Sequence, residues 1–210
     1  MRLGILGGTF NPIHFGHLRA AEEAREKINL DKVIFMPSGN PPLKTADLID
    51  ASHRYAMTRL ATASNVNFVV FDLEIRQTRK SYTVNTIQSL HEIYPEDELY
   101  FILGTDAFMD LPNWRQPEVL ISMIDFVVVT RPGFNSKDIF KSPYIRKSRL
   151  SSKPLIMTSG RKVISVQTTQ MDISSTKIRR LLKENKSIKY LLPKEVENYI
   201  YSHTLYQRDF

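Results

Sequence analysis

Short apolar runs alternate with segments of helical periodicity along most of this chain, and this alternation restricts the fold more than any other feature. Runs such as RLGIL (2–6), Leu99–Leu103 and Phe126–Thr130 are almost continuously apolar, as is typical of strands buried on both faces. Between such runs, apolar residues recur at helical spacing, first in Phe15–Ile28. The alternation predicts right-handed crossovers and a mainly parallel sheet covered by helices.

The same patterns give expected bounds for each element. We expect strands at 2–6, 33–36, 66–71, 99–103, 126–130 and 163–166. We expect helices at 15–28, 53–63, 83–93, 117–123, about 175–184 and 194–203, with Ser52 as the N-cap of the second. The expected fold class is α/β, a Rossmann-like, doubly wound, mainly parallel sheet with helices on both faces.

The chain has 210 residues, which suits one domain over 1–210 with a C-terminal helical part from about residue 174. Residues 133–153 are polar and basic without a clear period, and we interpret them as a long surface excursion. There is no cysteine, which excludes disulfides and favours a cytoplasmic location. No apolar run approaches the roughly 20 residues of a membrane helix, and no signal-peptide pattern opens the chain.

The positive charge is concentrated in the last third of the chain. Residues 131–190 hold 15 Lys and Arg against three Asp and Glu, whereas residues 1–130 hold 12 against 16. A field of this kind attracts anions such as nucleotides, phosphates or nucleic acid. A solvated basic surface accounts for the same charges, so charge alone leaves these alternatives open.

The stretch GGTFNPIHFGH (7–17) begins where the first expected strand ends and runs into the first expected helix. We expect a turn over Gly7–Pro12, in which Gly7 and Gly8 let the backbone approach a ligand closely. His14 and His17 then lie on one face of a turn at a helix start, where free N–H groups favour phosphate. Metal ligation would require a third protein ligand, and none stands nearby. Packing or capping histidines remain the alternative.

A second candidate segment is ISSTKIRRLL (173–182), just before a late helix. Ser174, Ser175 and Thr176 can cap this helix or bind an anion at its N-terminus. Arg179 lies one turn further along, where a guanidinium can bind a phosphate in bidentate fashion. A plain N-cap followed by a basic, solvated face is the alternative.

Two further stretches follow or precede expected elements. In LGTDAFMDLPNW (103–114), Gly104 allows close approach and Asp106 can cap a helix or bind a base or ribose. Trp114, the only tryptophan, suits either a packed position or a stacking platform. In RKSYTVNT (79–86), Thr83 is the expected N-cap, although its hydroxyl and nearby N–H groups could equally bind a carboxylate.

Together, HFGH (14–17) and ISSTKIR (173–179) resemble the paired motifs of the nucleotidylyltransferase superfamily. Within it, the chain is similar to the bacterial nicotinate-mononucleotide adenylyltransferase family, through GGTFNPIHFGHLR (7–19), PSGNPPLK (37–44), SYTVNT (81–86), GTD with PNW (104–114) and RPG (131–133). The resemblance implies transfer of the adenylyl group of ATP to nicotinate mononucleotide in NAD synthesis. It also implies Mg²⁺ bound with ATP, held by few protein ligands.

The resemblance also implies roles for individual residues. His14 and His17 would be the catalytic residues and would donate hydrogen bonds to the phosphates. ATP would be bound by Gly7, Gly8, Thr9, Phe10, Gly104, Asp106, Ser174, Ser175, Thr176 and Arg179, and nicotinate mononucleotide by Lys44, Tyr82, Thr83 and Trp114. No protein metal site, no nucleic-acid partner and no membrane partner are expected, and a homo-oligomer stays open.

The chain departs from the family pattern at two positions. Asn11 replaces the acid of the common GGTFDP, so we assign no catalysis to position 11. Leu43 stands where the family often has histidine before the basic residue, and only Lys44 matches there.

Two classes of alternative function remain. A sister transferase would use nicotinamide mononucleotide, and others would use phosphopantetheine or CTP, although SYT and PNW are not expected in a phosphopantetheine enzyme. A non-catalytic nucleic-acid-binding module would use the basic last third. Against that module, aromatic residues do not interleave with the basic ones.

Overall fold

The computed structural model describes residues 1–42, 47–130, 136–146 and 154–207. Its strands are β1 (Arg2–Gly8), β2 (Lys32–Pro37), β3 (Phe68–Val70), β4 (Glu98–Gly104), β5 (Asp125–Thr130), β6 (Leu155–Ile156) and β7 (Lys162–Gln167). Its helices are α1 (Phe15–Lys27), α2 (Ala51–Thr62), α3 (Thr83–Ile93), α4 (Thr105–Met109), α5 (Pro117–Met123), α6 (Ser175–Lys183) and α7 (Lys194–Ser202). Two 3₁₀ turns, η1 (Leu111–Asn113) and η2 (Ser136–Lys141), complete the described elements.

The strands form one sheet in the order β3-β2-β1-β4-β5-β7-β6. The pairs β1–β4, β4–β5 and β5–β7 are parallel, and the short β6 pairs antiparallel with β7. This confirms the predicted Rossmann-like, mainly parallel sheet. The strand order reverses between β1 and β4, where doubly wound sheets bind their ligands beyond the C-terminal ends of the strands. GGTFNPIHFGH and LGTD lie at those two ends, since Gly8 is the last residue of β1 and Gly104 the last residue of β4.

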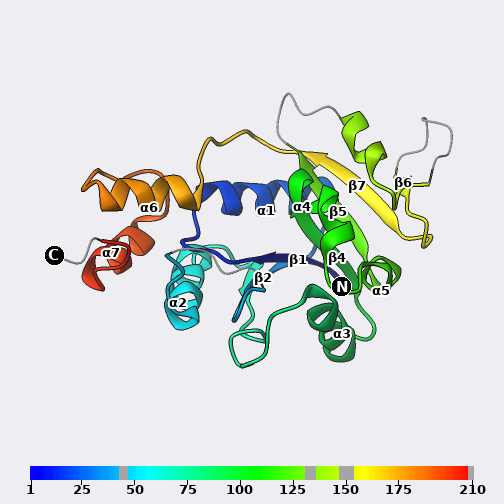
Figure 1. Ribbon diagram of the computed structural model, residues 1–210, viewed down its shortest axis with the longest axis horizontal. Coiled ribbons are helices and arrows are strands. Elements are labelled where there is room, and N and C mark those ends of the chain that lie inside the picture. Colours follow the sequence, from blue (N-terminus) through cyan, green and yellow to red (C-terminus); the bar gives the residue numbers. More distant parts are fainter. Residues whose placement is uncertain (43–46, 131–135, 147–153, 208–210) are drawn as a thin grey trace. The chain divides into compact units, whose positions relative to one another are not determined.

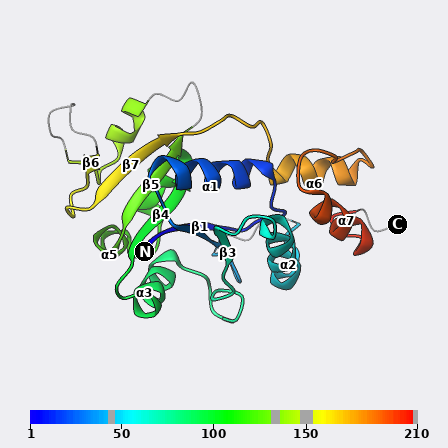
Figure 2. The same cartoon turned by 180° about the vertical axis from the view of Figure 1, so that it is seen from behind.

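The chain divides by its contacts into two compact units. Unit 1 comprises residues 1–7, 20–33 and 82–170, and unit 2 comprises residues 8–19, 34–81 and 171–210. In unit 1, α3 packs against α5 on one side of β1 and β4, while the second half of α1 lies on the other side (Figure 1). In unit 2, α7 packs against α2, and the same arrangement is visible from behind (Figure 2). The prediction of one domain over 1–210 stays a prediction.

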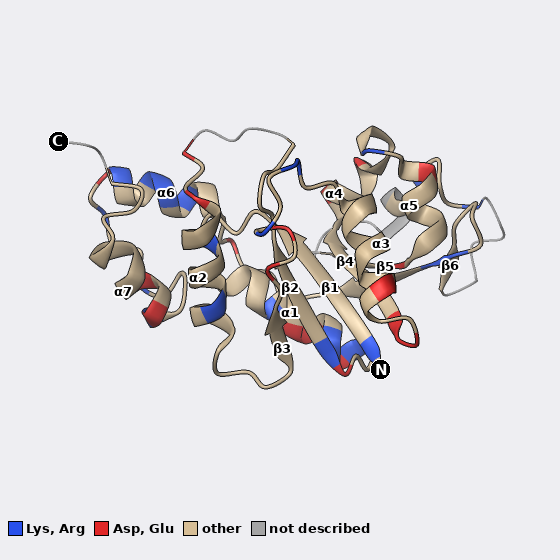
Figure 3. Cartoon of the chain, turned by 90° about the horizontal axis from the view of Figure 1, so that it is seen from below, with Lys and Arg blue, Asp and Glu red and all other residues tan. Residues whose placement is uncertain are grey.

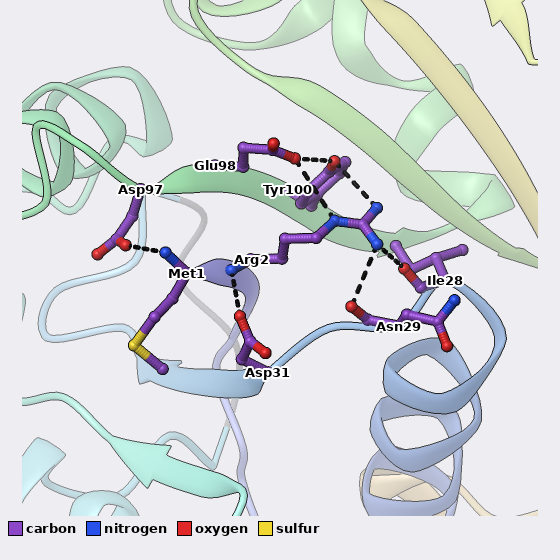
Figure 4. A network of polar contacts seen from close by, with 8 residues as sticks. All are labelled: Met1, Arg2, Ile28, Asn29, Asp31, Asp97, Glu98 and Tyr100. Carbon is purple, nitrogen blue, oxygen red and sulfur yellow. Dashed lines mark hydrogen bonds and ion pairs between the residues drawn. The ribbon is translucent and has the colours of Figure 1, made fainter.

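A polar network at the N-terminal ends of β1 and β4 belongs to unit 1 (Figure 4). The Arg2 guanidinium donates to the carbonyl of Ile28 at 2.6 Å and to the hydroxyl of Tyr100 at 3.1 Å. It also forms an ion pair of 3.4 Å with Glu98. Ligands of this fold bind beyond the opposite ends of the strands, so we interpret this network as a support for the sheet.

Several expected elements differ from those observed. The second helix begins at Ala51 with Asp50 as its N-cap, so Ser52 lies inside the helix and the predicted cap is wrong. β3 is shorter than its apolar run. The sequence patterns did not predict α4 and β6, because five and two residues are too few to show a period.

Part of the predicted surface excursion 133–153 is packed rather than irregular. Residues 136–141 form the 3₁₀ turn η2. The side chains of Ile139 and Ile145 are buried, and Ile145 forms a β-bridge with Met157. The apolar residues of this segment follow no helical or strand period, which is why the pattern did not reveal them. Residues 133–135 and 147–153 lie outside the described part of the chain.

Candidate functional site

The segment between β1 and α1 that leads to His14 and His17 (residues 9–17) is called the histidine turn. It lies some 160 residues from the start of α6 in sequence, and the two contact each other within unit 2. The Arg179 guanidinium donates through Nη1 to the carbonyl oxygen of Asn11 at 2.8 Å. The Ser175 hydroxyl donates to the carbonyl oxygen of Pro12 at 2.8 Å. The structure therefore joins the two segments that the sequence analysis singled out as one candidate site.

His14 and His17 stand at the first turn of α1 with their rings stacked. The ring centroids are 3.7 Å apart, with an interplanar angle of 27°. The backbone N–H of His14 donates to Nδ1 of His17 at 3.3 Å. Since Nδ1 accepts this hydrogen bond, a neutral His17 carries its proton on Nε2 and offers that nitrogen as a donor.

The environment keeps His17 neutral. Burial lowers the pKa of His17 well below its ordinary value of 6.5, and the neighbouring charge of a protonated His14 lowers the pKa further. Burial disfavours the charged form of an imidazole, and a second cation 3.7 Å away would repel it. A neutral imidazole with Nε2–H is a hydrogen-bond donor near neutral pH, rather than a cation.

Gly16 lets the two histidines stack. A Cβ built at Gly16 would lie 3.0 Å from Cε1 and from Nδ1 of His14, and 3.7 Å from the carbonyl oxygen of Ile173. A Cβ here would require the His14 ring to shift by a few tenths of an ångström, while the Ile173 oxygen lies at an ordinary van der Waals distance. The glycine of HFGH therefore lets the His14 ring take its observed position.

The sharp backbone turn falls on Phe10 instead of on the glycines. Gly7 and Gly8 belong to β1, and neither has a positive φ, so their predicted place in a tight turn is wrong. Phe10 has a φ of 47°, in the left-handed region that costs energy for a residue with a Cβ. The side chain of Phe10 is buried, and its ring meets the His17 ring edge-on at 5.2 Å. Burial of the ring offsets the strain and supports His17 from one side.

Asn11 has a structural explanation that the sequence did not provide. Its side chain is 3% exposed. Nδ2 donates to the carbonyl of Asp47 at 3.0 Å, and Oδ1 accepts from the hydroxyl of Tyr206 at 2.8 Å. A carboxylate could not donate to the Asp47 carbonyl, so an amide suits this position in this chain.

The N-terminus of α6 is capped as predicted. The Ser174 hydroxyl accepts from the backbone N–H of Lys177 at 3.2 Å. Thr176 is exposed. The Nε of Arg179 is buried and has no hydrogen-bond partner among the residues that the structure describes. That nitrogen is a donor held ready next to the histidine turn.

Arg54 is a buried residue of this region that the sequence analysis missed. Its guanidinium is fully buried and donates to three backbone carbonyls, those of Ile49 at 3.1 Å, Thr9 at 2.8 Å and Gly39 at 3.0 Å. Burial lowers the pKa of Arg54. An arginine inside an ordinary amphipathic helix gives no sequence signal for carbonyl partners that come from distant loops.

The basic residues of α6 are largely engaged with acidic neighbours. Lys and Arg gather along this helix (Figure 3). Lys177 pairs with Asp172 at 3.3 Å, and Lys183 pairs with Asp47 at 2.5 Å. Paired surface charges attract a polyanion less than free ones do, so this helix offers little support for the nucleic-acid alternative.

Apart from Gly7 in β1, the predicted residues of unit 1 lie at or after the end of β4 or at the start of α3. Gly104 is the N-cap of α4, and Asp106 is exposed within that helix, so its predicted capping role is wrong. Tyr82 is the N-cap of α3 and Thr83 its first residue, which corrects the predicted cap by one position.

Trp114 is half-buried, and its ring meets Phe101 edge-on at 6.2 Å. Its remaining ring surface is available for contact. The guanidinium of Arg115 lies 5.7 Å from the centroid of the Tyr82 ring. Lys44 lies outside the described residues.

No cluster of three or more His, Cys, Asp or Glu able to hold a metal ion occurs in the described ranges. The polar groups at the histidine turn are imidazoles, hydroxyls and a guanidinium, whereas Mg²⁺ is bound in proteins mainly through carboxylate, phosphate and water oxygens. Over the same ranges, no helix is long and apolar enough to cross a membrane.

Comparison with known proteins relates the chain to one family over most of its length. Residues 5–181 match the model of the cytidylyltransferase-like family. A protein of Geotalea daltonii named probable nicotinate-nucleotide adenylyltransferase is 42% identical over 212 residues, which cover 98% of both chains. A protein of Syntrophotalea carbinolica with the same name is 45% identical over 213 residues, covering 99% of this chain and 98% of its own.

Solved structures agree on the fold. Nicotinic acid mononucleotide adenylyltransferase of Plasmodium falciparum, complexed with NaAD, superimposes with a TM-score of 0.76. The two sequences are 19% identical, and the match covers 98% of this chain and 97% of the other.

Proposed function

The chain belongs to the cytidylyltransferase-like family, and from this premise we propose that it is a nicotinate-nucleotide adenylyltransferase. It transfers the adenylyl group of ATP to nicotinate mononucleotide, giving nicotinate adenine dinucleotide and pyrophosphate. Relatives with this name match the chain over almost its whole length. The observation that carries the proposal is the contact of Arg179 with Asn11, which joins the histidine turn to α6.

The reaction needs no general base. The nucleophile is the 5′-phosphate of nicotinate mononucleotide, and a phosphate monoester with a second pKa of about 6 is mostly a dianion at neutral pH. One of its oxygens forms a bond to the α-phosphorus of ATP. The bond from that phosphorus to the oxygen bridging to the β-phosphorus breaks, and pyrophosphate leaves with the electron pair. The chemical difficulty is charge, since two anions must approach each other.

The side chains of the site suit that difficulty. The Nε2–H of His17 donates to the α-phosphate, and His14 contributes beside it. Arg179 binds the leaving β- and γ-phosphates through its guanidinium, whose Nε has no partner among the described residues. Ser174, Ser175 and Thr176 form the N-terminus of α6, where backbone N–H groups and the helix dipole favour an anion, while the Ser175 hydroxyl stays bound to the Pro12 carbonyl. Catalysis of this kind rests on positioning and electrostatic stabilisation.

The remaining predicted residues are assigned by the family resemblance. Gly7, Gly8, Thr9 and Phe10 hold ATP through their backbone, and Gly104 with Asp106 lies on the adenosine side. Trp114 stacks on the nicotinate ring. Thr83, with Tyr82 and neighbouring N–H groups, reads the carboxylate, and Lys44 completes the set.

Magnesium enters as part of the substrate, Mg-ATP. The described residues of the site offer imidazoles, hydroxyls and a guanidinium but no carboxylate cluster, so phosphate oxygens and water would supply most of the ligands of the ion. Bound there, it neutralises charge on the phosphates. The protein side chains then orient the phosphates and donate hydrogen bonds to them.

A comparison of acceptors tests the proposal. Purified protein is incubated with Mg-ATP and one acceptor at a time: nicotinate mononucleotide, nicotinamide mononucleotide or phosphopantetheine. A further sample contains CTP in place of ATP with an acceptor phosphate, and pyrophosphate release is measured in each. We expect release with nicotinate mononucleotide to exceed strongly the release with nicotinamide mononucleotide. Release with the amide alone would establish the sister activity, and release with none of them would overturn the proposal.

A further inference from the structure

The turn between β1 and α1 has its carbonyl oxygens bound by side chains from elsewhere in unit 2. The Thr9 carbonyl accepts from Arg54 at 2.8 Å. The Asn11 carbonyl accepts from Arg179 at 2.8 Å, and the Pro12 carbonyl from Ser175 at 2.8 Å. A carbonyl oxygen carries partial negative charge and repels a phosphate. Donors that bind these oxygens fix their direction and reduce that repulsion.

Tyr206 holds the same turn through a side chain instead of a carbonyl. Its hydroxyl donates to Oδ1 of Asn11 at 2.8 Å across 195 positions of sequence. Both residues are buried, at 7% and 3% exposure. Water therefore reaches this hydrogen bond poorly, and loss of the hydroxyl would leave the amide oxygen of Asn11 without its donor.

We infer that Tyr206 is a positioning residue, which acts through Asn11 to set the histidine turn and the Arg179 guanidinium for the triphosphate. The inference rests on the proposed function. Asn11 connects Tyr206 with Arg179, since its side chain accepts from Tyr206 while its backbone carbonyl accepts from Arg179. Displacement of Asn11 moves the acceptor that aims Arg179. Misplacement by about 1 Å can slow an enzymatic reaction a hundredfold.

The hydroxyl of Tyr206 stays a donor throughout the working range of pH. Burial raises its pKa above the ordinary value of 10.0, and the guanidinium groups of Arg179 and Arg54 oppose that rise only in part. The phenol is therefore neutral near pH 7. Its two cationic neighbours also place it among the groups that hold the turn.

The test is Tyr206→Phe, which removes one oxygen and keeps the ring. With nicotinate mononucleotide saturating, we expect kcat/KM for ATP to fall about tenfold, and KM for nicotinate mononucleotide to change less than twofold. Tyr190→Phe is the matched control, because Tyr190 is 87% exposed in the same unit, and it should behave as the wild type. A merely structural role would lower the active fraction and leave KM for ATP unchanged.

A double-mutant cycle separates positioning from general damage. In an Arg179→Lys background, Tyr206→Phe should cost less than twofold, because both act on the same triphosphate contact. If the losses in kcat/KM for ATP caused by Arg179→Lys and by Tyr206→Phe multiply fully in the double variant, the inference is overturned. A kcat/KM for ATP within twofold of the wild type in Tyr206→Phe alone would overturn it too.

If Tyr206→Phe does not accumulate as folded protein, Asn11→Ala tests the same hydrogen bond, because it removes the acceptor. Its KM for ATP should rise, and an unchanged KM would contradict the inference. Wild-type protein without transferase activity would instead refute the proposed function, so the two failures are distinguishable.

Discussion

The backbone N–H of His14 donates to Nδ1 of His17, and this one bond decides which nitrogen of the neutral second histidine carries the proton. With Nδ1 engaged as an acceptor, Nε2 of the neutral ring carries the proton. Burial and the neighbouring histidine hold the ring neutral. The H-x-G-H turn therefore presents a hydrogen-bond donor that carries no charge.

The first prediction concerns that donor. His17→Ala should lower kcat for adenylyl transfer on the order of 10²-fold or more, as the loss of one donor to a developing anion does. The circular dichroism spectrum should stay that of the wild type. His203→Ala, on an exposed histidine of the same unit, serves as the control. Near-full turnover in His17→Ala would remove His17 from the mechanism.

The lowered pKa of His17 also predicts a pH dependence of stability. The unfolded chain binds a proton at His17 below about pH 6.5, whereas the folded chain resists protonation until the pH is well below that value. The free energy of unfolding should therefore be complete above pH 6.5 and fall as the pH drops below it. His17→Gln should flatten this fall, as measured by urea unfolding from pH 7.5 to 5. Parallel curves for the two proteins would show that His17 titrates normally.

Loss of the α6 cap gives a prediction on stability. Ser174→Ala should lower the free energy of unfolding by about 1 kcal/mol, because the N–H of Lys177 loses its acceptor. For a chain of this size the thermal midpoint should fall by about 2–4 °C. Ser174→Asp keeps an acceptor oxygen and should retain the midpoint. Equal midpoints for wild type and Ser174→Ala would mean that the cap contributes nothing.

The proposed stacking role of Trp114 predicts a selective effect on one substrate. Trp114→Ala should raise KM for nicotinate mononucleotide more than KM for ATP, since only the first carries the pyridine ring. Trp114→Phe, which keeps an aromatic face, should lie between the two. Steady-state kinetics with each substrate varied in turn measure the split. Equal rises in both KM values would assign Trp114 to packing against Phe101.

Sequence patterns predicted what depends on local order. The Ser174 cap follows from a hydroxyl before a helical period, and the long strands β1, β4 and β5 follow from apolar runs long enough to show. That the histidine turn and the start of α6 belong to one site was implied by the resemblance of HFGH and ISSTKIR to the paired motifs of one superfamily.

The remaining features of the site depend on distant partners. Arg54 binds carbonyls of three separate segments, and Tyr206 reaches Asn11 from the far end of the chain. A buried arginine or tyrosine looks like any other in the sequence, because backbone acceptors have no side-chain signature. The left-handed backbone conformation of Phe10 is likewise not predictable from the sequence, because burial of its ring selects a conformation that its residue type disfavours.

The most direct test follows the phosphorus atoms of ATP. Purified protein is given nicotinate mononucleotide with ATP labelled either at the α- or at the γ-phosphorus, and the products are separated. The account predicts α-label in nicotinate adenine dinucleotide and γ-label in pyrophosphate, in equal amounts. Transfer of the γ-label to the mononucleotide, or its release as inorganic phosphate, would contradict adenylyl transfer.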